Sequence, residues 1–106
     1  MAYITELNAK NYQQFIKNNN LAMVDIWANW CSPCKLLSPI VDEVSVDLSG
    51  VLSVGKLDAD SNSEILKETN IRNIPAILIY RNGELVDKSI GLVSKQKLID
   101  LVNKYV

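Results

Sequence analysis

The feature that most constrains the fold of this chain is the stretch VDIWANWCSPCKLLSPI, residues 24–40. The run AMVDIWA, residues 22–28, is apolar, β-branched and aromatic, which is typical of a buried strand. From Cys31 onward, apolar residues recur at helical spacing, at Leu36, Leu37, Ile40, Val41, Val44 and Leu48. The only two cysteines, Cys31 and Cys34, are therefore predicted at the start of a helix that follows a strand.

Strand-like and helical segments alternate along the first half of the chain. Strands are predicted at residues 3–5 and 51–57, and a helix at residues 8–19 with Asn8 as its N-cap. Pro39 lies inside the predicted helix after the cysteines, where it lacks an amide donor, so we expect it to kink that helix.

Two further helices carry capping signals at their starts. Ser61 and Glu64 fit a capping box for a short helix that ends near Glu68. Ser94 can cap a final helix with one apolar stripe.

A hairpin is predicted between strands at residues 76–80 and 84–90, because Asn82-Gly83 is a strong signal for a tight turn. The predicted order is βαβαβαββα. Strands alternating with helices imply parallel crossovers in the first half, and the hairpin adds an antiparallel pair. A mixed central sheet with helices on both faces follows.

Length and charge exclude several functions. The chain has 106 residues, of which 48% are apolar, so it can bury a core, and we expect one domain over residues 1–106. Its net charge of -1 argues against a nucleic acid or an anionic membrane as partner, since such binding needs clustered Lys and Arg. The apolar runs are far shorter than the ~20 residues of a membrane span. The N-terminus lacks a signal-peptide pattern, so the expected location is the cytoplasm.

The absence of histidine narrows the chemistry further. It excludes a Cys-His or Ser-His catalytic pair and any zinc site with imidazole ligands. Two cysteines alone fall short of the four ligands of a structural zinc site, unless two chains share one ion. We expect no bound metal.

The spacing of the cysteines favours a disulfide that opens and closes. Residues three apart at a helix start lie on one face, and a first cysteine at the boundary can swing inward to the ~3.8 Å between Cβ atoms that a disulfide needs. Such a short loop gains little stability, whereas a structural disulfide would join distant segments. Redox chemistry is therefore the favoured interpretation. The alternatives are two ordinary small core residues or half of a metal site.

The helix start gives the two thiols different roles. Free amides and the helix dipole favour an anion there, so Cys31 should ionise readily and attack target disulfides as a thiolate. Cys34 lies one turn inside, so we expect it to be more buried and to act as the resolving thiol. Pro33 is tolerated in the first turn, where its missing amide costs nothing.

Several stretches of the chain resemble the thioredoxin family, namely VDIWANWCSPCK, SPIVDEV, VGKLDAD, IRNIPAILIYRNGE and SIGLVSK. The resemblance covers essentially the whole chain. It implies the thioredoxin fold, an α/β architecture in which about four helices flank a mixed central sheet of about five strands. It also implies a dithiol–disulfide oxidoreductase that reduces protein disulfides and is recharged by a thioredoxin reductase. The chain has no Gly-rich dinucleotide loop, and we expect no bound cofactor.

The resemblance also implies residue roles. Cys31 matches the nucleophile and Cys34 the resolving thiol of the family. Asp25 matches a buried acid behind the cysteines, which would accept the proton of Cys34, although the residues alone fit an exposed position on an edge strand equally well. Lys56 matches the lysine beside that acid, which it would tune. Pro75 matches a cis-proline that faces the disulfide.

The expected substrate-binding surface is flat and apolar, and comprises Trp30, Pro33, Ile74, Pro75, Gly91 and Leu92. The backbone of Ile74 would pair with an extended substrate strand.

Three positions depart from the family pattern. Ser32 stands where glycine is usual, Ala76 where threonine is common, and Leu92 where the residue is smaller. We expect Ser32 to tune the reduction potential, because residues between the cysteines alter the solvation of the thiolate. Leu92 would reshape the substrate groove.

Two other functions remain open at this point. The same fold could serve a thiol oxidant or isomerase, or a non-catalytic binding subunit of a larger assembly. The favoured hypothesis is a monomeric reductase whose partners are disulfide-containing proteins.

Overall fold

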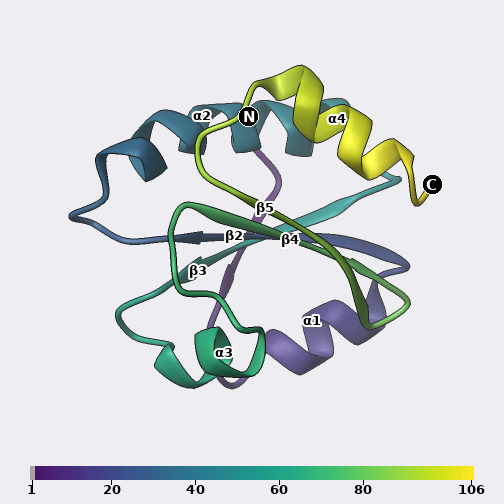
Figure 1. Ribbon diagram of the computed structural model, residues 1–106. Helices are drawn as coiled ribbons and strands as arrows, with labels where there is room; N and C mark the ends of the chain where they lie inside the picture. The colour runs from purple at the N-terminus through teal and green to yellow at the C-terminus, as the bar shows by residue number, and fades with distance from the viewer. Residues whose placement is uncertain (1) are drawn as a thin grey trace.

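The computed structural model describes residues 2–106, and within them a five-stranded sheet carries two helices on each face. The strand order is β1 (Ile4–Leu7), β3 (Ser53–Asp58), β2 (Leu21–Trp27), β4 (Ala76–Arg81) and β5 (Glu84–Ile90). Helices α1 (Tyr12–Asn18) and α3 (Ser63–Glu68) cover one face, while α2 (Ser32–Asp47) and α4 (Lys95–Asn103) cover the other (Figure 1). The predicted mixed α/β fold is confirmed.

The sheet combines parallel and antiparallel pairs. β1 and β2 both run parallel to β3, as the alternation of strands and helices predicts. β4 runs antiparallel to β5 through a turn in which Asn82 and Gly83 both have positive φ, so the predicted hairpin is confirmed. β4 also runs antiparallel to β2, which no local pattern predicted.

Side chains of the central strand β2 alternate between the two faces of the sheet. Leu21 and Met23 pack in the core beneath α2 and α4, whereas Val24 and Ile26 pack in the core beneath α1 and α3. Because successive side chains of a strand point to opposite faces, Asp25 lies on the same face as Met23, toward α2.

The predicted start of the first helix was wrong. α1 begins at Tyr12 after Asn11, and not after Asn8. The Asn8 side chain instead accepts hydrogen bonds from the amides of Lys10 (2.8 Å) and Asn11 (3.1 Å), which closes a turn ahead of the helix. Pro39 lies inside α2, and the kink expected there stays a prediction.

The other two capping signals had different outcomes. α3 begins after Asn62, so the predicted capping box at Ser61 was wrong. Asn62 donates a hydrogen bond to the carbonyl of Asp58 (2.8 Å) and ties the helix start to the preceding loop. Ser94 does cap α4, since its hydroxyl accepts a hydrogen bond from the amide of Lys97 at 3.1 Å.

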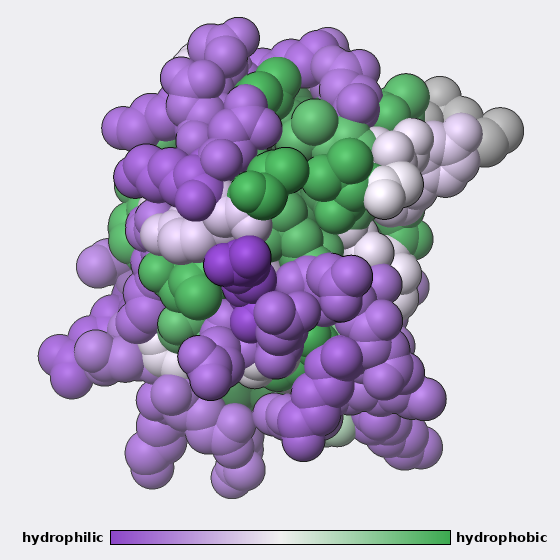
Figure 2. Space-filling model, turned by 90° about the vertical axis from the view of Figure 1, so that its right-hand side faces the viewer, coloured by the Kyte–Doolittle hydropathy of each residue, from purple (hydrophilic) through white to green (hydrophobic). Residues whose placement is uncertain are grey.

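The loop before α2 and the C-terminus lie at opposite ends of the molecule (Figure 1). The loop from β2 to α2, which ends at Cys31, lies at the left-hand end in Figure 1. Figure 2 shows the opposite end, where polar side chains cover much of the surface around an apolar cluster. Val51 and the C-terminal Val106 line a hollow there with Arg81. Within residues 2–106, no helix has both the length and the apolar character that crossing a membrane requires.

Candidate active site

Cys31 and Cys34 form a disulfide at the start of α2, with their Cα atoms 5.3 Å apart. Cys31 is the N-cap residue of this helix, and its Sγ accepts a hydrogen bond from the amide of Cys34 at 3.2 Å. Ser32 opens the helix with an exposed side chain, and Pro33 follows in the first turn. A thiolate on Cys31 would thus lie where free amides and the helix dipole favour negative charge.

The two cysteines do not differ in burial, contrary to the sequence-based expectation. Cys31 is 4% exposed and Cys34 is 3% exposed. Since the disulfide joins the two sulfur atoms, it holds both against the same part of the core. The asymmetry lies in the hydrogen bonding instead, because the Cys31 sulfur accepts the helix amide.

Asp25 is a buried acid without a partner. It is 1% exposed, and neither carboxylate oxygen has a hydrogen-bond partner among the described residues. Burial disfavours the charged carboxylate and raises the pKa of Asp25 to about 7. The positive charge of Lys56 partly offsets this rise, and the negative charge of Asp42 adds to it. An exposed position on an edge strand is excluded.

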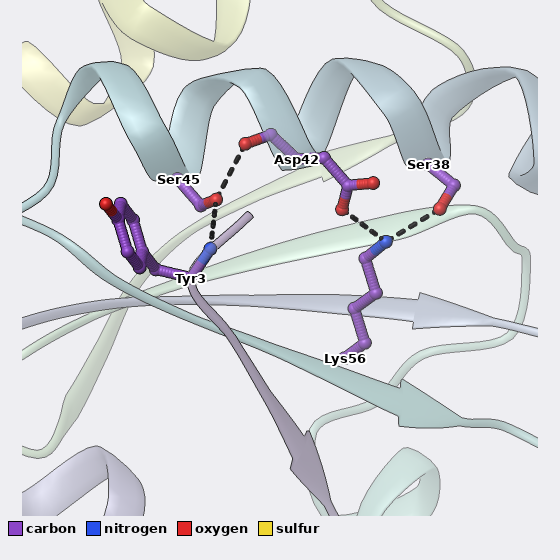
Figure 3. A network of polar contacts seen from close by, with 5 residues as sticks. All are labelled: Tyr3, Ser38, Asp42, Ser45 and Lys56. Atoms are coloured by element: carbon purple, nitrogen blue, oxygen red, sulfur yellow. Dashed lines mark hydrogen bonds and ion pairs between the residues drawn. The ribbon is translucent and has the colours of Figure 1, made fainter. Parts of the chain in front are cut away.

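Lys56 lies beside Asp25 in the sheet, but its ammonium group binds elsewhere. The two residues are direct register partners on the parallel strands β2 and β3. Lys56 Nζ, however, donates to Ser38 Oγ at 2.6 Å and to Asp42 Oδ1 at 2.8 Å, both on α2 (Figure 3). The lysine therefore acts on Asp25 by charge, without a hydrogen bond to it.

Ser38 and Asp42 are site residues that the sequence analysis did not identify. They lie four residues apart, which places them on one face of α2. Figure 3 shows both side chains directed from the helix toward the sheet. Their helical spacing, next to the buried Leu37 and Val41, was the available signal.

A pocket of about 490 Å³ extends from Cys34 to Ser38 and Lys56 of this polar cluster. Its lining includes Cys34, Lys35, Ser38, Lys56 and Trp27. Cys34 therefore lines the same pocket as the Lys56 side chain. Among the described residues, no group of three histidine, cysteine, aspartate or glutamate side chains is arranged to hold a metal ion.

Strand register brings the remaining predicted residues to the same end of the sheet as the disulfide. Ile26, near the end of β2, is paired with Ala76 at the start of β4. Ala76 is in turn paired with Ile90 at the end of β5. The segments next to these residues therefore adjoin the loop that carries Cys31.

The segment before β4 and the segment after β5 contact each other. The Ile74–Pro75 peptide bond is cis, as expected. The amide of Gly91 donates a hydrogen bond to the carbonyl of Pro75 at 2.8 Å. Gly91 has a φ of 96°, a left-handed conformation that favours glycine at this contact.

The predicted substrate surface is only partly exposed. Trp30 is 69% exposed and Leu92 is 48% exposed, whereas Pro75 is buried, and so it contributes little to an open surface. Ile74 and Gly91 are half-buried and Pro33 is exposed. The indole of Trp30 donates to the carboxylate of Asp60 at 3.1 Å, which fixes the ring against the loop after β3.

Several known proteins that are similar to this chain are thioredoxins. The family model described as Thioredoxin matches residues 3–104. A thioredoxin of Rickettsia felis is 43% identical over 94 residues, which are 89% of this chain and 90% of the relative. A thioredoxin of Pyropia yezoensis is 39% identical over 104 residues, or 97% of each chain.

A solved structure has the same fold. A single-residue mutant of a thioredoxin from Halobacterium salinarum NRC-1 superposes with a TM-score of 0.89 at 25% sequence identity. The match covers 96% of this chain and 89% of that one.

Proposed function

Because this chain belongs to the thioredoxin family and carries the Cys31–Cys34 pair of a dithiol–disulfide oxidoreductase, we propose that it works as a reductant of disulfides in other proteins. The observation that carries this proposal is the hydrogen bond from the α2 amide to the Cys31 sulfur. It favours the thiolate of Cys31, which is the attacking form in disulfide exchange.

The reaction proceeds in two exchanges. The Cys31 thiolate attacks one sulfur of a target disulfide; a mixed disulfide forms, and the other target sulfur leaves as a thiolate. Cys34 then passes its proton to Asp25 and attacks the Cys31 sulfur. The Cys31–Cys34 bond forms, the bond from Cys31 to the target breaks, and the second target sulfur leaves as a thiolate. Two electrons pass from the protein to the target.

Asp25 is the proton acceptor in this scheme. Its buried and unpaired carboxyl group, with a pKa of about 7, is a base matched to neutral pH. Lys56 tunes Asp25 by charge. Ser32 tunes the reduction potential, since it lies between the two cysteines.

The target protein binds at the rim around the disulfide. Trp30, Pro33 and Leu92 offer exposed apolar contacts, and this supports a partner held with little sequence preference. The backbone of Ile74 pairs with an extended target segment, with Pro75 and Gly91 behind it.

The remaining features of the proposal are the oligomeric state, the location and the electron donor. The protein acts as a monomeric, single-domain carrier over residues 1–106 in the cytoplasm, and a thioredoxin reductase returns its disulfide to the dithiol. The similar thioredoxin M-type of Spinacia oleracea is described as chloroplastic, so fractionation of the source cells is the test of location.

Trapping of targets tests the function and the roles together. With dithiothreitol as electron source, the parent should speed reduction of an exposed disulfide in a test protein, and Cys31→Ser should fall to the rate of dithiothreitol alone. Cys34→Ser should accumulate mixed disulfides, because no thiol remains to release the target. Equal trapping by the two variants, seen on non-reducing gels, would contradict the assignment.

A further inference from the structure

The position of the Lys56 ammonium group is unexpected from the sheet alone. Asp25 and Lys56 are register partners on neighbouring parallel strands. Adjacent strands lie ~4.8 Å apart, and paired residues point to the same face. Val54 and Met23 belong to the core beneath α2, so the alternating positions Lys56 and Asp25 share that face.

A direct ion pair between these two residues would therefore be the default. Burial of a carboxylate without a partner is costly, and an ion pair with the lysine on the next strand would offset that cost. Instead, the Asp25 oxygens have no partner among the described residues, and Lys56 Nζ is bound by Ser38 at 2.6 Å and Asp42 at 2.8 Å.

Both of these partners come from α2, the helix that begins with the cysteines. Ser45 adds a second link from the inner face of α2. Its Oγ donates a hydrogen bond to the carbonyl of Asp42 (2.6 Å) within the helix and accepts one from the amide of Tyr3 (3.1 Å) (Figure 3). The network thus binds α2 to β3 at Lys56 and to the segment before β1 at Tyr3.

We propose that Ser38 and Asp42 are positioning residues for disulfide exchange, which hold the Lys56 ammonium on α2 and keep it from pairing with Asp25. The carboxyl group of Asp25 then stays free to take the proton of Cys34. This inference rests on the proposed role of Asp25 as the base.

The charges around Asp25 are few, so the effect of each can be separated. Lys56 faces it from β3 and Asp42 from α2, while β4 contributes the apolar Ile77 as register partner. Beyond Lys56, β1 places the exposed Glu6 in register with that lysine. If Asp42 lost its charge, Lys56 would be released toward Asp25 and would stabilise its carboxylate.

Titration of Asp25 in the disulfide form tests the positioning directly, because the cysteines do not titrate there and cannot couple to it. Followed by NMR of the carboxyl carbon, Asp42→Asn should lower the pKa of Asp25 by roughly one pH unit. Adding Ser38→Ala, which changes no charge, should lower it further. Glu43→Gln is the matched control, since it removes the same charge from α2 but its carboxylate contacts Lys95.

A Lys56→Met background separates positioning from direct charge. Asp42→Asn should there lower the pKa of Asp25 by less than half as much as in the parent. Equal lowering in both backgrounds would show that Asp42 acts on Asp25 only by its own charge, and would overturn the proposal. No lowering in the parent background would overturn it as well.

A kinetic measurement separates failure of this inference from failure of the proposed function. When the reduced protein reacts with a chromogenic aromatic disulfide, the second release of thiolate reports the attack by Cys34. The rate of this second release should fall at low pH, where Asp25 is protonated. In Asp42→Asn this fall should occur at lower pH, shifted by the same amount as the pKa of Asp25 in the titration. If the pKa of Asp25 shifts in Asp42→Asn but the pH dependence of the second release does not, Asp25 is not the base. If the pKa of Asp25 does not shift, the positioning by Asp42 is refuted.

Discussion

At the residue scale, Asp25 links stability to chemistry. Its folded pKa of about 7 lies above the ordinary value of 3.8, because burial penalises the carboxylate. Between these two values the folded protein binds more protons than the unfolded chain, so stability falls as pH rises through that window. Above the folded pKa the loss is constant.

Asp25→Asn should therefore stabilise the protein at pH 8. The amide is buried at some cost but carries no charge, so we expect a gain of about 2–4 kcal/mol in the free energy of unfolding, at ~1.4 kcal/mol for each pH unit between the two pKa values. The gain should shrink toward pH 4, where the parent carboxyl group is protonated in the folded state. Urea melts at several pH values measure it.

The same variant should exchange disulfides more slowly, since no base remains for Cys34. Asp100→Asn, at an exposed position on α4, is the control and should change little at any pH. An Asp25→Asn protein with the same stability as its parent at both pH 8 and pH 4 would refute the unpaired, buried acid.

At the element scale, the helix starts show how local signals compete. The hydroxyl of Ser94 caps α4, whereas Ser61 precedes α3 without serving as its cap. Ser94→Ala should therefore lower the free energy of unfolding by about 1 kcal/mol, because the amide of Lys97 loses its acceptor.

Ser61→Ala is the matched control for this substitution. It should leave stability within about 0.5 kcal/mol of the parent, as is usual for exposed positions. Urea denaturation of the two variants side by side measures the difference. A larger loss in Ser61→Ala than in Ser94→Ala would restore the capping box that the sequence predicts.

At the scale of the whole molecule, two separate cores share one sheet. Leu78 is fully buried in the core beneath α1 and α3, and Leu98 is fully buried in the core beneath α2 and α4. Because the two cores are formed on opposite faces of one sheet, we expect them to unfold together.

Leu78→Ala and Leu98→Ala should each lower the free energy of unfolding by about 2–5 kcal/mol. In both variants, tryptophan fluorescence and far-ultraviolet circular dichroism should report one coincident transition. Leu36→Ala, at a position 62% exposed, is the control and should cost far less. Two resolved transitions would contradict a single folding unit.

Local sequence patterns determined the order of the elements and the place of the chemistry. The alternation of strand-like and helical segments, the Asn82-Gly83 turn and the cap at Ser94 all depend on backbone preferences over a few residues. Local patterns also predicted Cys31 at a helix start, because a strand-like run followed by helical spacing is enough to locate that start. The buried position of Asp25 was predicted only with the help of the family resemblance.

The tertiary structure alone decided which residues meet. The sequence around Asn8 and Ser61 fits a helix cap, but Asn11 and Asn62 occupy the N-cap positions of α1 and α3. The direction of β4 against β2, and the binding of Lys56 by Ser38 and Asp42 from α2, depend on how distant segments pack. The periodicity of a sequence predicts on which face of a strand or helix a side chain lies. Which residue of another element it contacts depends on how the sheet and the helix pack together.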